Sequence, residues 1–79
     1  MLQIRTKGGK IYLKRERLIK LRQDVGQSQE EFGKIFGISG QNQGQIENGK
    51  RKPNANYILT LLDKFELTPN EVLEMFKEG

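Results

Sequence analysis

Helix start and stop signals recur along this chain and divide most of its length into short segments. Two capping boxes, in which Ser or Thr is followed three residues later by Glu, begin at Ser28 and Thr68. Two further N-cap residues are Ser39 and Asn54. The residues typical of helix ends are Gly26, Gly37 and Asn48–Gly49. Signals at this frequency predict an all-α chain of short helices.

Apolar residues between these signals recur at the three- and four-residue spacing of amphipathic helices. We expect five helices, at about residues 14–24, 29–36, 40–47, 55–65 and 69–79. The third has poor intrinsic propensity, because Gly40 and Gly44 each cost on the order of 1 kcal/mol relative to Ala. Its neighbours must therefore hold it in place.

Residues 1–13 show a different pattern and are treated as a separate N-terminal segment before the domain at 14–79. Apolar and polar residues alternate around Gly8-Gly9, as in a β-hairpin. A two-residue turn there would pair Thr6 with Ile11 and Ile4 with Leu13. An isolated hairpin is marginal in water, so a basic arm and a plain charged face remain alternatives.

The composition excludes several classes of function. The chain has 79 residues, no Cys and no His, which leaves no disulfides, no zinc site built from these residues and no Ser-His or Cys-His catalytic pair. We expect one small domain with no cofactor, no metal and no catalytic cluster. No apolar run approaches the roughly 20 residues of a membrane span, so we expect a soluble, cytoplasmic protein.

Basic charge is concentrated in two blocks. Residues 1–22 carry eight Lys and Arg against one Glu, a net +7, and residues 50–52 add +3, whereas the whole chain carries only +4. Such asymmetry favours a polyanionic partner such as nucleic acid. The alternative is a solvated charged face.

The segment between these blocks, "GISGQNQGQIENGKRKP" at 37–53, contains many amides and glycines and few apolar residues. A plain loop would explain it, and so would a surface that contacts a polar partner. If a helix forms, Gln41 and Gln45 share one face, flanked there by Gly40 and Gly44.

The longer segment "SQEEFGKIFGISGQNQGQIENGKRKP" resembles the helix-turn-helix of the Cro/CI-type repressors, also called the XRE family. The "SQEE" start, the "GIS" turn and the "IENGKRKP" exit carry the resemblance, which extends from about Leu18 to Phe76. It implies a five-helix domain like that of lambda repressor, with the second helix of the motif in the DNA major groove. It also implies a sequence-specific regulator of bacterial or phage type, a repressor that binds a palindromic operator as a homodimer.

The resemblance also implies roles for single residues. Gln can form a bidentate hydrogen bond to adenine, and the implied base-reading set is Gln41, Gln45, Asn42, Gly40 and Gly44, the glycines permitting close approach to the bases. The implied phosphate-binding set is Gln29, Ser39, Asn48, Lys50, Arg51 and Lys52. The implied structural ion pair joins Arg22 and Glu47.

Two residues depart from the family pattern. Gln43 stands where Ile or Val is usual, so either its amide is buried with a partner, or the helix is rotated or frayed, or the side chain faces DNA. Gln27 stands where Leu is common. Both weaken a small core, so we expect modest stability until DNA or a second subunit binds.

The last predicted helix suggests a dimer contact. Its apolar residues Val72, Leu73, Met75 and Phe76 span more of the surface than one packing stripe requires. We expect Phe76→Asp to abolish dimerisation and spare the fold, with a dimer that forms mainly on DNA. A free strand edge of the hairpin offers a second route.

Three other functions compete with the repressor. An antitoxin that represses its own operon would have this fold and a toxin as partner; an antirepressor protein is another conceivable partner. A protein-interaction module that has lost DNA binding would explain Gln43 and the two glycines of the third helix. An enzyme is the weakest alternative, because the remaining carboxylates, lysines and hydroxyls form no clustered pattern.

Overall fold

The computed structural model describes residues 4–5, 11–12 and 14–77. In chain order it contains β1 (Ile4–Arg5), β2 (Ile11–Tyr12), α1 (Glu16–Asp24), α2 (Gln29–Ile35), α3 (Gly40–Glu47), α4 (Ala55–Lys64) and α5 (Pro69–Phe76). The five predicted helices and the all-α fold are confirmed. Within the described ranges, no helix has the length and apolar character needed to cross a membrane.

The helix boundaries follow the capping signals closely. Ser28, Ser39, Asn54 and Thr68 are N-caps whose side chains accept a hydrogen bond from the backbone N–H of the third helical residue. Gly37 after α2 and Gly49 after α3 have φ of 73° and 80°, in the left-handed region where a glycine has no Cβ penalty. The capping and turn residues therefore determine where the helices of the motif begin and end.

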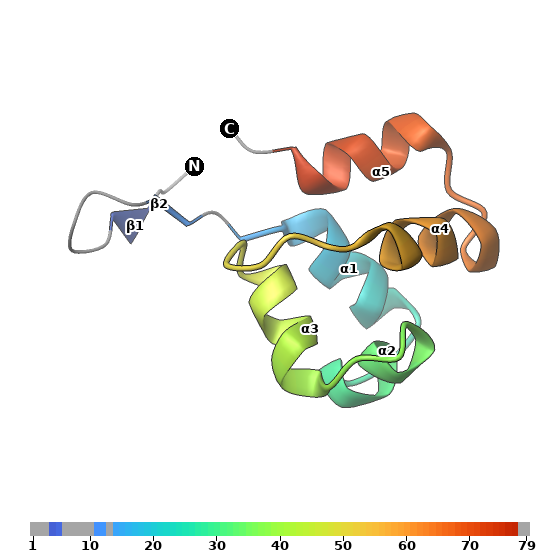
Figure 1. Ribbon diagram of the computed structural model, residues 1–79, viewed down its shortest axis with the longest axis horizontal. Coiled ribbons are helices and arrows are strands. Elements are labelled where there is room, and N and C mark those ends of the chain that lie inside the picture. Colours follow the sequence, from blue (N-terminus) through green and yellow to red (C-terminus); the bar gives the residue numbers. More distant parts are fainter. Residues whose placement is uncertain (1–3, 6–10, 13, 78–79) are drawn as a thin grey trace.

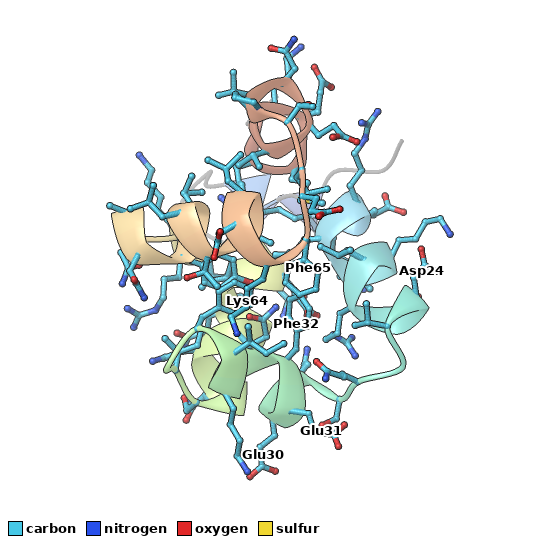
Figure 2. All side chains as sticks on the ribbon, turned by 90° about the vertical axis from the view of Figure 1, so that its right-hand side faces the viewer. Asp24, Glu30, Glu31, Phe32, Lys64 and Phe65 are labelled. Carbon is cyan, nitrogen blue, oxygen red and sulfur yellow. The ribbon has the colours of Figure 1, made fainter. Side chains whose placement is uncertain are left out.

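Aromatic rings form much of the buried core, and Figure 1 shows how the helices are arranged. The ring of Phe36 stacks on that of Tyr57 with centroids 3.8 Å apart, and Phe32 meets Phe36 edge to face at 5.2 Å. Figure 2 shows Phe32 and Phe65 directed toward each other in the interior, while Glu30 and Glu31 of the same helix as Phe32 point outward. The fully or largely buried apolar residues are Leu18, Phe32, Phe36, Ile46, Tyr57, Leu61, Val72 and Met75.

Close backbone packing fixes α2 against the turn that leads to α3. A Cβ on Gly33 would lie 2.8 Å from the carbonyl oxygen of Ile38 and 3.0 Å from that of Ser39. Real Cβ atoms essentially never approach backbone atoms so closely. The chain can therefore make this turn against α2 only because residue 33 has no side chain.

The N-terminal strands pair with a register different from the expected one. Ile4 pairs with Tyr12 and Arg5 with Ile11, antiparallel. The prediction of Ile4 opposite Leu13 is wrong by one residue, a slip that moves every side chain of a strand to the other face. Thr6, Gly8, Gly9 and Leu13 lie outside the described residues.

Candidate nucleic-acid interface

Helix α3 has a polar outer face and a buried inner face. Gln41 is exposed, and Gln45 and Asn42 are partly exposed. On the other side Gln43, Ile46 and Glu47 are buried. Three amide side chains are therefore presented outward from a helix whose opposite face is held by the domain.

Gln43, the residue that departs from the family pattern, is completely buried and fully partnered. Its Nε2 donates to Oε2 of Glu47 at 2.9 Å, and its Oε1 accepts from the hydroxyl of Tyr57 at 2.7 Å. Of the alternatives left open by the sequence, the buried amide with a partner is the one observed. Helix α3 is neither frayed there nor turned to expose Gln43.

Glu47 lies at the centre of a buried hydrogen-bond network. Its carboxylate accepts from Arg22 Nε at 2.6 Å, from Arg22 Nη2 at 3.3 Å and from Gln29 Nε2 at 3.0 Å, in addition to Gln43. Its side chain is only 2% exposed. We call the group Arg22, Gln29, Gln43, Glu47 and Tyr57 the polar cluster; it joins α1, α2, α3 and α4.

The polar cluster shifts the pKa of two of its members. Burial alone would raise the pKa of Glu47, but the hydrogen bonds from Arg22, Gln43 and Gln29 and the charge of Arg22 hold it below its ordinary value. Burial raises the pKa of the Tyr57 hydroxyl well above its ordinary value. Glu47 is therefore a carboxylate and Tyr57 a neutral donor at neutral pH.

A Cβ built on either glycine of α3 would point toward α2. A Cβ on Gly40 would lie 3.0 Å from Cα of Glu30, and one on Gly44 would lie 3.4 Å from the side-chain amide of Gln29. A Cβ at position 40 would press on the backbone of α2, whereas one at position 44 would make ordinary van der Waals contact with a flexible side chain. The lack of a side chain at Gly40 therefore lets α3 pack closely on α2. The close approach of Gly40 and Gly44 to DNA bases stays a prediction.

The remaining predicted phosphate-binding residues lie at the two ends of α3. Ser39 is the N-cap, and its hydroxyl oxygen accepts from the backbone N–H of Asn42 at 3.1 Å. Asn48 is the C-cap and is exposed, and the exposed residues of the following loop are Lys50, Arg51 and Lys52. Gln29, at the start of α2, is exposed, although its amide donates to Glu47.

Arg15 is a site residue that the sequence did not indicate beyond its charge. It is 7% exposed, and its Nη1 donates to the carbonyl oxygens of Ile46 at 2.7 Å and Arg51 at 2.8 Å. Its backbone N–H donates to the carbonyl of Glu47, and its guanidinium lies 5.2 Å from the centre of the Phe76 ring. Arg15 therefore connects the end of α3 and the basic loop at residues 50–52 to α5.

The comparison with protein families agrees with this arrangement. The family model described as helix-turn-helix matches residues 18–72, which is most of the chain. Neither the curated proteins nor the solved structures provided a match. The matched range contains α2, the glycine turn and α3, the two helices and connection of the motif. The chain belongs to the Cro/CI-type, or XRE, family of helix-turn-helix domains, which are DNA-binding transcription regulators.

Proposed function

We propose that the protein is a sequence-specific repressor that inserts α3 into the major groove of double-stranded DNA. The outward presentation of Gln41 and Gln45 from a helix anchored on its opposite face is the observation that carries this proposal. The major groove displays a distinct pattern of donors and acceptors for each base pair, which amide side chains can read. A regulator that occupies its operator in this way blocks other proteins from the same DNA.

The residues around α3 are suited to grip the DNA backbone on both sides of the reading helix. Lys50 and Lys52 extend from the loop that follows α3, and both are exposed. Ser39 and Gln29 lie at the N-terminal ends of α3 and α2, where backbone N–H groups and helix dipoles favour phosphate. Contacts to phosphate position a protein on the duplex, and contacts to base edges supply the specificity.

Selection of bound duplexes from a random pool tests the proposal, followed by titration of the enriched site at several salt concentrations. We expect one enriched motif, and we expect Lys50→Ala and Lys52→Ala each to lower the salt slope by about one ion on specific and non-specific DNA alike. Asp63→Ala, at an exposed position of α4 outside this face, is the control. No enrichment over the starting pool would contradict the proposal.

The dimer that we propose on palindromic DNA uses a smaller part of α5 than the sequence suggested. Val72 and Met75 are buried, and Phe76 packs against Tyr57 with ring centroids 6.1 Å apart and beneath Arg15. Phe76→Asp would therefore damage the fold, contrary to the expectation above. Leu73, which is 68% exposed, is the apolar residue of α5 left for a partner.

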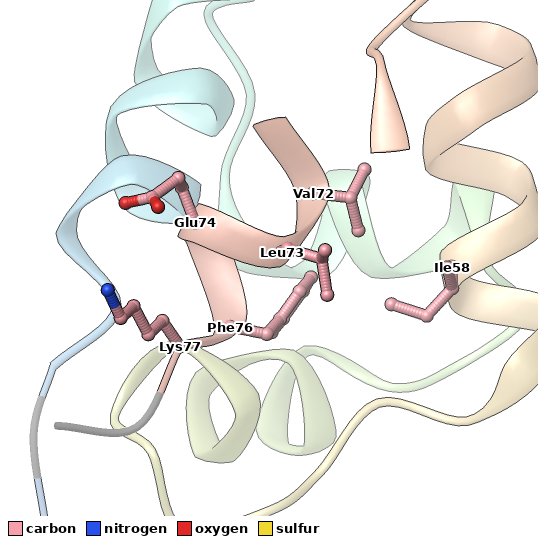
Figure 3. Close-up of a pocket in the computed structure, with 6 residues that line it drawn as sticks. All are labelled: Ile58, Val72, Leu73, Glu74, Phe76 and Lys77. Carbon is pink, nitrogen blue, oxygen red and sulfur yellow. The ribbon is translucent and has the colours of Figure 1, made fainter. Parts of the chain in front are cut away.

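Leu73 lies at a groove between α4 and α5. Figure 3 shows Leu73 and Phe76 on the side of α5 that faces Ile58 of α4, with Glu74 and Lys77 at the edge. A two-fold contact at this groove would bring two reading helices to one palindrome, with half-sites about 34 Å apart. An exposed apolar surface at a groove is a common form of protein contact.

Replacing Leu73 tests the dimer without disturbing the core. We expect Leu73→Asp to abolish cooperative occupancy of a palindrome and to retain binding to a single half-site. Leu59→Asp is the matched control, because Leu59 is an exposed leucine of α4 that does not line the groove. One chain per palindrome in sedimentation equilibrium of the wild-type complex would refute the dimer.

A further inference from the structure

The side chain of Gln45 is held by the loop that follows its own helix. Nε of Arg51 donates to Oε1 of Gln45 at 3.1 Å, and the backbone N–H of Arg51 donates to the carbonyl oxygen of Gln45 at 3.2 Å. The carbonyl of Arg51 accepts in turn from the buried guanidinium of Arg15 at 2.8 Å. Arg51 is thus anchored on both sides, and it contacts one of the two proposed reading amides.

This contact determines which way the amide of Gln45 faces. A guanidinium has only donors, so the amide oxygen must face Arg51 and the NH₂ group must face away from it. A bidentate bond to adenine needs both amide atoms at the base, with the oxygen accepting from N6 and the NH₂ donating to N7. With its oxygen directed at Arg51, Gln45 presents N–H donors to the groove.

Arg51 adds further donors beside those of Gln45. Its Nη groups make no hydrogen bond within the part of the chain that the structure describes, and the residue is exposed. Guanine is the base whose major-groove edge carries two acceptors, O6 and N7. A cluster of donors without a free acceptor therefore matches guanine and mismatches the N6 donor of adenine.

We propose that Arg51 is a positioning residue for Gln45, and that the pair selects guanine at the base pair that Gln45 faces. The inference rests on the proposed base-reading function of α3. It replaces two expectations from the sequence, namely adenine as the target of Gln45 and phosphate as the sole target of Arg51. Phosphate contact by Arg51 is an outcome that the experiment below separates.

The test measures the affinity of the full chain for four versions of the selected site that differ at one base pair. That base pair is the one at which Gln45→Ala loses discrimination. We expect the wild type to prefer guanine there by about tenfold. Arg51→Ala should lose most of this preference and gain relative affinity for adenine, because the released amide can turn and bind adenine with both atoms.

Lys50→Ala is the matched control, because it removes a neighbouring exposed charge and keeps the one hydrogen bond described between Lys50 and Gln45, which is from backbone N–H to backbone carbonyl. It should weaken binding to all four sites by the same factor and keep the preference for guanine. In the Gln45→Ala background, the further change Arg51→Ala should alter the ranking of bases less than it does in the wild type, because only the Nη donors of Arg51 itself are then lost. Thermal unfolding of each variant checks that the fold is retained.

Three results would overturn the inference. If Arg51→Ala weakens all four sites equally, as Lys50→Ala does, then Arg51 contacts only phosphate. A wild-type preference for adenine at this base pair would show that the amide faces the other way. If Gln45→Ala changes the ranking at no base pair, Gln45 reads no base, and the proposed function fails at this residue together with the inference.

Discussion

The interior contains two kinds of packing, and the two hold different parts of the molecule. Apolar side chains fill the space between α1, α2, α4 and α5, where residues such as Leu18, Phe32 and Leu61 are completely buried. The polar cluster lies beneath α3, where Gln43 and Glu47 are equally buried but bonded to named partners. The helix proposed to read DNA therefore has an inner face that combines the apolar Ile46 with buried, hydrogen-bonded polar groups.

The two kinds of packing differ more in how they fix the orientation of a helix than in how much they stabilise the fold. Apolar burial contributes free energy roughly in proportion to area and has no preferred direction. A buried ion pair contributes little net stability, because desolvation offsets the attraction, yet removing one partner is costly. Helix α3 has two glycines and little apolar surface, so the polar cluster and Arg15 fix the direction in which Gln41 and Gln45 point.

The largest effect is expected from breaking the buried ion pair. Glu47→Gln keeps the size of the side chain but leaves the charge of Arg22 uncompensated, so we expect a loss of about 3 kcal/mol or more in the free energy of unfolding. Urea unfolding at pH 7 measures it. The control is Asp24→Asn, which breaks the exposed pair Lys20–Asp24 at 3.4 Å and should cost less than about 1 kcal/mol. Equal losses for the two variants would contradict the larger contribution expected of the buried ion pair.

A smaller loss is expected from the neutral part of the polar cluster. Gln43→Leu restores an apolar residue but leaves the buried hydroxyl of Tyr57 without its acceptor, and we expect a loss of about 2 kcal/mol. Adding Tyr57→Phe should recover part of this loss, because both partners of the hydrogen bond are then apolar. A double-mutant cycle by chemical unfolding measures the coupling. Additive losses would show that the Gln43–Tyr57 bond is unimportant.

The polar cluster should also make stability depend on acid pH. Because the pKa of Glu47 is lower in the folded state, its contribution is present above the unfolded pKa and is lost as the pH falls through the folded value. We expect Glu47→Gln to flatten the acid limb of a plot of stability against pH. Leu61→Ala, in the apolar region, should lower the whole curve and keep its slope. The capping carboxylates Glu31 and Glu71 keep some slope in every variant.

The smallest effect concerns Gln27, at the edge of the polar cluster. Its backbone carbonyl accepts from Arg22 at 2.9 Å, whereas its side-chain Oε1 is buried without a hydrogen-bond partner among the described residues. Replacing it by Leu removes an unsatisfied acceptor and should raise the free energy of unfolding by about 1 kcal/mol. Thermal unfolding measures the change. A destabilised Gln27→Leu would imply that the amide has a partner in solution.

The contrast between the two regions also explains what could be predicted from the sequence. Periodicity and capping residues are local signals, so they located all five helices and most of the apolar core. The partners of Gln43 could not be predicted in this way, because Tyr57 lies 14 positions further along the chain and meets it only through the packing of α4. The contacts of Arg15 with residues 46, 47 and 51 likewise depend on the folded arrangement.

Prediction of the functional site from the sequence was limited in the same way. The resemblance to the family identified the outer face of α3 and the pair Arg22–Glu47, whose atoms lie 2.6 Å apart. It did not indicate that Gly40 and Gly44 face α2, because a helical wheel shows which residues share a face and not which neighbour covers it. The hydrogen bond from Arg51 to Gln45 was also hidden, since it depends on how the loop folds back on the helix.

Replacing Gln41 is the most direct way to find out whether the polar cluster holds α3 so that its outer amides read bases. Gln41 is exposed on the outer face, so its replacement by Ala should leave the fold intact. The measurement is the affinity of wild type and Gln41→Ala for every single-base variant of the selected site. We expect a loss of about 1–3 kcal/mol on the preferred site and the loss of discrimination at one base pair only. An equal loss on every sequence, or no loss, would contradict the claim.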